Sequence, residues 1–108
     1  MEIASGLLKL KPNSNGKIEE WKNVLSSRLK EVQDTLLNEG VTIESWFIIE
    51  IDGQDYLLWY MRAKSIKRAA EKFQQSKHAI DQLHKEFIAE VVVDNGMIPA
   101  SPLIDLST

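Results

Sequence analysis

Apolar residues recur at helical spacing over one long stretch in the first half of the chain. Between residues 18 and 36 they fall three or four positions apart, which places them on one side of a helix about five turns long. Ser14 or Asn15 is suited to cap its start, and Gly40 is suited to end it, because glycine enters the left-handed conformation without steric penalty. The pattern predicts one helix that packs on a flat partner. Its apolar stripe consists of Ile18, Trp21, Leu25, Leu29, Val32 and Leu36.

Two later runs, residues 41–51 and 55–62, are rich in β-branched and aromatic residues and predict a β-hairpin. Asp52-Gly53 between them is a favoured pair for a tight turn of the primed type. A two-residue turn also fixes the register of the two strands. It would pair Ile51 with Gln54, Phe47 with Leu58, and Trp46 with Trp59.

The remaining segments complete an alternating order of strands and helices. Residues 3–10 predict a first strand, residues 65–91 a helical region, and residues 103–106 a short strand at an edge. The helical region lacks apolar anchors at residues 74–77, so we expect two helices or one with a kink. The order is that of the ferredoxin-like βαββαβ fold, an α+β class with helices on one face of a four-stranded antiparallel sheet. We expect residues 1–108 to form a single domain, with residues 95–108 as a tail that can include an edge strand.

Composition narrows the classes of function. The chain has 108 residues, a net charge of −3 and no cysteine, which excludes disulfides, thiolate metal sites and cysteine nucleophiles. Its longest apolar runs are far too short to span a bilayer, and acidic Glu2 does not suit a signal peptide. We therefore expect a cytoplasmic protein without membrane or nucleic-acid partners. The closest basic cluster is typical of a solvated helix face; it comprises Lys64, Lys67, Arg68 and Lys72.

His84 is the first candidate for chemistry, because it falls on the apolar arc of the second helical region. An imidazole there needs a partner. It is either a core histidine bonded to backbone or Tyr, or an acid–base or ligand-orienting group in a pocket. His78 and Asp81 fall on other sides of the helix, so the three do not converge on an ion. We predict a buried, hydrogen-bonded His84, an exposed His78, no metal and no cofactor.

Both faces of the predicted hairpin carry large apolar groups, although two helices can cover only one. We assign the more aliphatic face, which includes Tyr60 and Arg62, to the helices. Arg62 then either pairs with Glu86 or Glu90 or binds an anionic ligand. The other face predicts a homodimer interface, because aromatic residues and Met are enriched at such surfaces; the C-terminal tail is the alternative cover. The interface residues are Trp46, Ile48, Leu57, Trp59 and Met61.

Two segments carry a resemblance to known proteins. EIDGQDYLLWYMR at residues 50–62 and SKHAIDQLHKEF at residues 76–87 resemble an uncharacterised bacterial family of similar length, over about residues 8–91. That family is labelled only as a domain of unknown function, so the resemblance implies no catalytic residue. More distantly, the order of elements is similar to the dimeric α/β-barrel group. That group includes cofactor-independent monooxygenases related to antibiotic biosynthesis, haem-binding enzymes and proteins with no known activity.

Two hypotheses of function follow. The first is a small dimeric binding or accessory protein without catalysis, which holds a small organic ligand between the sheet and the helices. The second is a cofactor-independent enzyme, monooxygenase-like or isomerase-like, that uses His84, Tyr60 and Arg62. We favour the first, since no spacing in the sequence forces an acid–base pair. The second requires those three side chains to converge in one pocket.

Overall fold

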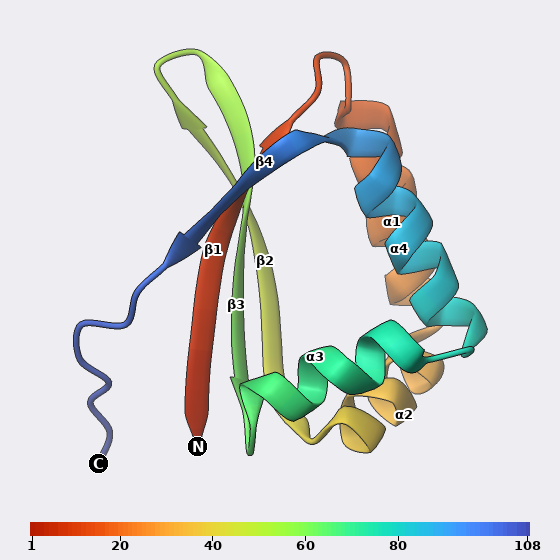
Figure 1. Ribbon diagram of the computed structural model, residues 1–108. Coiled ribbons are helices and arrows are strands. Elements are labelled where there is room, and N and C mark those ends of the chain that lie inside the picture. Colours follow the sequence, from red (N-terminus) through yellow and green to blue (C-terminus); the bar gives the residue numbers. More distant parts are fainter.

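Four antiparallel strands form one open sheet in the computed structural model, which describes residues 1–108 (Figure 1). The strand order is β2-β3-β1-β4, and four helices lie on one side of the sheet, so the expected α+β class is confirmed. No helix is both long and apolar enough to cross a membrane. Along the chain the elements are β1 (Glu2–Leu10), α1 (Asn15–Ser27), α2 (Leu29–Glu39), β2 (Val41–Ile51), β3 (Gln54–Ala63), α3 (Ile66–Gln75), α4 (Ala79–Val91) and β4 (Val92–Ala100).

The β2–β3 hairpin has the predicted register. Asp52 and Gly53 form its two-residue turn, with φ of 50° and 79°. Two consecutive positive φ values define the primed turn that matches the twist of the flanking strands. The three predicted pairs are all present: Ile51 with Gln54, Phe47 with Leu58, and Trp46 with Trp59.

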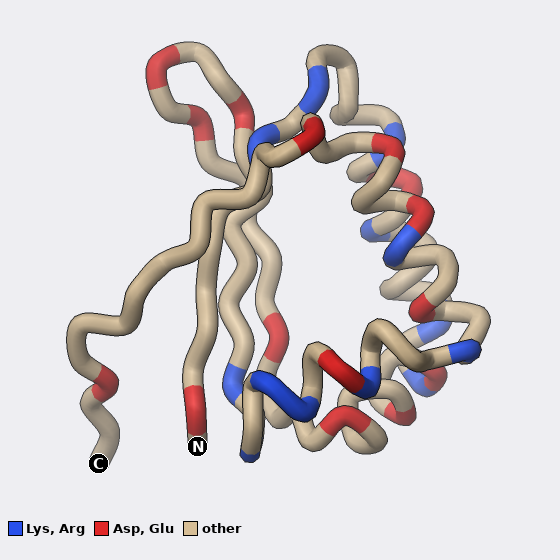
Figure 2. Tube along the Cα trace, viewed as in Figure 1, with Lys and Arg blue, Asp and Glu red and all other residues tan.

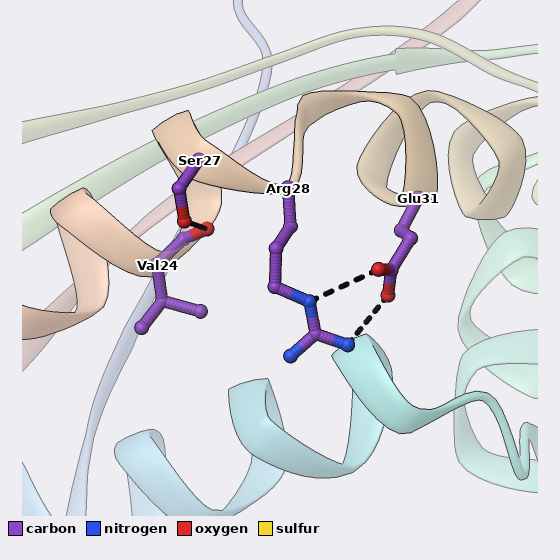
Figure 3. A network of polar contacts seen from close by, with 4 residues as sticks. All are labelled: Val24, Ser27, Arg28 and Glu31. Carbon is purple, nitrogen blue, oxygen red and sulfur yellow. Dashed lines mark hydrogen bonds and ion pairs between the residues drawn. The ribbon is translucent and has the colours of Figure 1, made fainter.

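The single long helix predicted from the first apolar stripe is wrong, because the helix breaks at Arg28 (Figure 3). Arg28 has φ −122° and ψ 38°, outside the helical range. The Ser27 hydroxyl donates to the carbonyl of Val24 at 3.0 Å, and Arg28 Nε donates to Glu31 Oε1 at 3.1 Å. Such side-chain bonds compete with helical continuity and hold the junction. The break displaces Leu29 from the stripe and leaves it 56% exposed.

The other helix ends agree better with the sequence. Gly40 ends α2 with φ 75°, as predicted. The second helical region divides into α3 and α4, which confirms the expectation of two helices over that of one kinked helix. At the junction the Ser76 hydroxyl donates to Asp81 Oδ2 at 2.6 Å and accepts the backbone N–H of His78 at 3.1 Å. Ser76 therefore fixes the start of α4.

The last strand is β4, not the predicted segment at residues 103–106, which has no regular structure and is exposed. The chain passes from α4 into β4 at Val91 and Val92 without a loop. Successive β-branched residues favour this change to extended backbone. Asn95, which we expected to begin the C-terminal tail, has φ 58° and lies where the pairing of β1 with β4 shifts register. It therefore forms an irregularity within an edge strand. Pro99, opposite Gly6, is tolerated in the same strand because proline lacks only the N–H donor, which an edge position does not require.

The expected assignment of the two sheet faces is wrong. Leu57 is 2% exposed beneath the helices, and Trp46, Trp59 and Met61 pack against the same covered core; Ile48 alone is 54% exposed. The aliphatic face is the open one. Lys9 lies on that face, opposite Tyr56, and Arg62 lies on the same face nearer the other end of β3. Both charged residues mark this face as the side away from the core.

Two clusters of buried side chains join the covered face to the helices. The larger joins α1, α4 and the central strands, and the smaller joins α3 to the start of β2 and the end of β3. A β-bulge between Val41 and Ile43 turns Val41 to the covered side, whereas Ile43 lies on the open face. The larger cluster contains Leu8, Leu10, Ile18, Trp21, Leu57, Phe87 and Val91, and the smaller contains Val41, Ala63 and Ala69.

Replacing Gly53 by Val should lower the free energy of unfolding by about 1 kcal/mol or more, because a β-branched residue is strained at positive φ. Gly16→Val is the matched control: at both positions an added Cβ would meet no atom within 4 Å, but only Gly53 has positive φ. Equilibrium denaturation of both variants checks the difference. Equal midpoints would show that the turn is not of the primed type.

Candidate functional site

A groove of about 310 Å³ lies between the sheet and the helices, where the two core clusters separate. Its volume falls within the range of small-molecule sites, about 300–1,000 Å³. Strands form its floor and helices α3 and α4 its roof, and most lining residues are apolar. The floor consists of Leu8, Glu44, Trp46, Trp59, Met61 and Met97, and the roof and end consist of Glu39, Ile66, Ala69, Ala70, Phe73, Gln74, His84 and Ile88.

The floor of the groove is shaped by two indoles. Trp59 lies over Gly6 of β1, where an added Cβ would stand 3.0 Å from both the indole Nε1 and the carbonyl oxygen of Ile98. Glycine at this position therefore gives the Trp59 ring its place. Trp46 is held by a hydrogen bond from its Nε1 to Glu44 Oε2 at 3.1 Å. Both rings thus have defined positions beneath the helices.

His84 lies in the roof inside an aromatic cluster. Its ring centroid is 5.2 Å from those of Trp21 and Phe73 and 5.4 Å from that of Trp46. The side chain makes no hydrogen bond and is partly buried, so the predicted hydrogen-bonded core histidine is wrong, whereas His78 is exposed as predicted. Burial lowers the pKa of His84 to about 4, despite the opposing attraction of Asp81. The imidazole is therefore neutral near pH 7.

Glu39, in the last turn of α2, is the residue that sequence reasoning missed. It is only 8% exposed, lines the groove, and makes no hydrogen bond or ion pair. Burial raises the pKa of Glu39 to about 7, with further contributions from the charges of Asp81 and Glu44. A signal existed, because Glu39 follows Val32 by about two turns and so lies on the same apolar stripe.

Two further carboxyl groups lie around Glu39. Burial raises the pKa of Glu44, although its hydrogen bond from Trp46 acts in the opposite direction. Asp81 is 7% exposed and accepts the Ser76 hydroxyl. A smaller hollow of about 40 Å³ lies beside the groove and shares Glu39, Glu44 and His84 with it. No group of three or more His, Cys, Asp or Glu side chains is placed so that it could hold a metal ion.

The structure does not bring together the three side chains of the enzyme hypothesis. Tyr60 and Arg62 lie on the open face of β3, whereas His84 faces the covered side. The Arg62 guanidinium lies 5.7 Å from the centre of the Tyr60 ring and pairs with Asp105 at 2.7 Å. The predicted pairing of Arg62 with Glu86 or Glu90 is therefore wrong. The chemistry of the groove is that of apolar surface, one unpaired carboxyl group and a neutral imidazole.

Comparison with protein families matches residues 1–105 to DUF6176, described as a family of unknown function. This agrees with the resemblance to an uncharacterised family that the hairpin and α4 carry. Among curated proteins, none matches the chain.

Replacing Glu39 by Gln should change how stability depends on pH. In the unfolded chain this carboxyl group ionises near pH 4.5, but in the folded protein only near pH 7. Its contribution to stability is therefore complete below pH 4.5 and is lost as the pH rises through 7. From pH 5 to pH 8 the free energy of unfolding of the variant should therefore rise by on the order of 2 kcal/mol relative to that of wild type.

Denaturation of both proteins at pH 5 and pH 8 measures that difference. His84 and Glu44 also make stability depend on pH, but their contributions cancel when the variant is compared with wild type, provided that they are equal in the two proteins. Glu71→Gln, on the exposed side of α3, is the control and should follow wild type. If Glu39→Gln also follows wild type across this range, the carboxyl group is already ionised in the folded protein at pH 5.

Proposed function

The chain belongs to DUF6176, a family of unknown function, and we propose that it is a small dimeric binding protein that holds an organic ligand in the groove. The observation that carries this proposal is the groove itself, with its apolar lining and few polar groups. Such a composition is typical of sites that bind small molecules. Trp46 and Trp59 offer flat surfaces for the ligand body, and no catalytic step is assigned.

The order of the strands supports the more distant relation to ferredoxin-like proteins. β3 lies between β1 and β2, and both pairings are antiparallel, so β1 and β2 run parallel. The helical segments between β1 and β2 therefore connect two parallel strands that have β3 inserted between them, which is a split βαβ unit. In the proposed assembly, as in dimeric α/β barrels, two sheets face one another and each keeps its helices outside.

The open face of the sheet supports the dimer. Its middle is uncharged: residues 3–8, 45–49, 56–61 and 96–100 contain no Asp, Glu, Lys or Arg, and Figure 2 shows the charges on the helices, at strand ends and at the hairpin tip. Five large apolar side chains of this face are between 37% and 53% exposed. Together they reach the order of 300–600 Å², the size of the largest patch on a typical monomer. They are Ile43, Phe47, Ile49, Ile51 and Ile98.

A second copy of the chain is the occupant that fits this face. A two-fold axis through the sheet makes one apolar patch complementary to itself. The tail is the other segment that could cover this face, but its own apolar residues are exposed: Leu103 is 97% exposed and Leu106 is 78% exposed. Arg62 and Asp105 hold the tail at one end of the face and leave the centre open.

Binding in the groove is tested with 4-phenylbutan-1-ol, a neutral probe with an apolar body, by isothermal titration calorimetry. Ala70 is exposed in the roof, so Ala70→Phe should fill the groove and weaken binding about tenfold or more. Ala89→Phe, on an exposed position of α4 outside the groove, should bind as wild type does. Equal affinities of the two variants, or no binding to wild type, would contradict the groove as the site. Native mass spectrometry of the purified protein then identifies a ligand retained from the cell.

The dimer is tested by light scattering across a range of concentrations. Wild type should be a dimer, and Phe47→Glu should be a folded monomer, because it buries a charge in an apolar interface. Leu37→Glu is the control, since Leu37 is 78% exposed on α2, away from the sheet. It should leave the dimer intact. A wild-type monomer at every concentration would refute the dimer.

A further inference from the structure

Near pH 7 the groove can carry charge of one sign only. Glu39 and Glu44 are its acidic residues, and no Lys or Arg lines it. His84 does not offset them, because its imidazole is neutral near pH 7. An ionised ligand group inside the groove therefore meets a negative potential, which low-dielectric walls strengthen.

Glu39 lacks the partner that a buried carboxylate needs. It is nine-tenths buried, and no side chain or backbone group donates a hydrogen bond to it. Lys72 of α3 approaches this end of α2, but its Nζ donates to the carbonyl oxygen of Asn38 at 2.9 Å in an exposed position. Asp81 and Glu44 repel its charge. Buried ionised groups in proteins are otherwise paired.

The walls beside Glu39 and Glu44 are aromatic. Trp46 and Trp59 lie in the floor and Phe73 in the roof. The face of an aromatic ring attracts a cation, and Trp does so most strongly. A carboxylate next to such rings is a combination suited to an ammonium group with an apolar body.

We propose that the ligand of this groove is an organic amine, bound as its cation with the ammonium group at Glu39 and the apolar body between the indoles of Trp46 and Trp59. This inference rests on the proposed binding function. It supplies the partner that Glu39 lacks and places no charge beside another of the same sign. An anionic ligand would instead bring a further negative charge beside Glu39 and Glu44.

The test compares three probes with the same phenyl body and chain: 4-phenylbutylamine, 4-phenylbutan-1-ol and 4-phenylbutanoate. Titration calorimetry at pH 8 keeps the amine charged and favours the ionised form of Glu39. Wild type should bind the amine about tenfold or more tightly than the alcohol, and the carboxylate more weakly than the alcohol. Glu39→Gln should lose the preference for the amine but keep its affinity for the alcohol. Glu71→Gln, outside the groove, should retain both.

The outcomes separate the two proposals. Binding of the alcohol with no preference for the amine would overturn the organic cation while the binding function stands. Tighter binding of the carboxylate would also overturn it. Failure of all three probes would contradict both. A preference for the amine that Glu39→Gln retains would show that another group holds the ammonium and would refute the role of Glu39.

Discussion

The structure depends on one constraint: its sheet is apolar on both faces, but its helices cover only one. The covered face takes the larger aromatic side chains, and the helices above them are not close enough everywhere to fill the space. The groove is what remains between the core around α1 and α4 and the core around α3. The open face is the other result of the same constraint. A binding site and an assembly surface thus arise on opposite sides of one layer.

The polarity of the groove comes from a single turn of the chain. Glu39 is the last residue of α2, Gly40 ends the helix, and Glu44 follows within β2. The two acids therefore approach the groove from either side of one connection. Since α4 brings His84 to the same region, burial acts on three titratable groups together. It favours the neutral forms of His84, Glu39 and Glu44, which is why the groove holds polar groups without a network of salt bridges.

Where a feature was fixed by local chemistry, the sequence was sufficient to predict it. Asp52-Gly53 determined the turn and with it the register of β2 and β3, and Gly40 ended its helix. The choice of sheet face was not local. Both faces of the hairpin are apolar, and the larger number of aliphatic residues on one face led us to place that face against the helices, which is wrong. Lys9 on the partner strand β1 was the residue that marked the open side.

The candidate site was predicted only in part, for similar reasons. His84 was placed correctly on an inward helix face, but its aromatic neighbours come from α1, β2 and α3, which no spacing along one helix reveals. Glu39 was missed because the stripe was ended at Leu36, although its phase continues. The sequence did not reveal the break at Arg28, because apolar residues recur at helical spacing on both sides of it. The hydrogen bond that Arg28 donates to Glu31 helps to hold the break, and it follows from no apolar pattern.

The position of β1 in the sheet sets a condition on how the chain folds. The hairpin of β2 and β3 is the sheet's only local pairing and can form within microseconds once its turn is made. β1, by contrast, pairs Ser5 with Tyr60 on one side and with Ala100 on the other. Each of these pairings closes a long loop, which raises contact order and slows folding. During synthesis the first strand must therefore wait, unpaired, for partners from the middle and the far end of the chain.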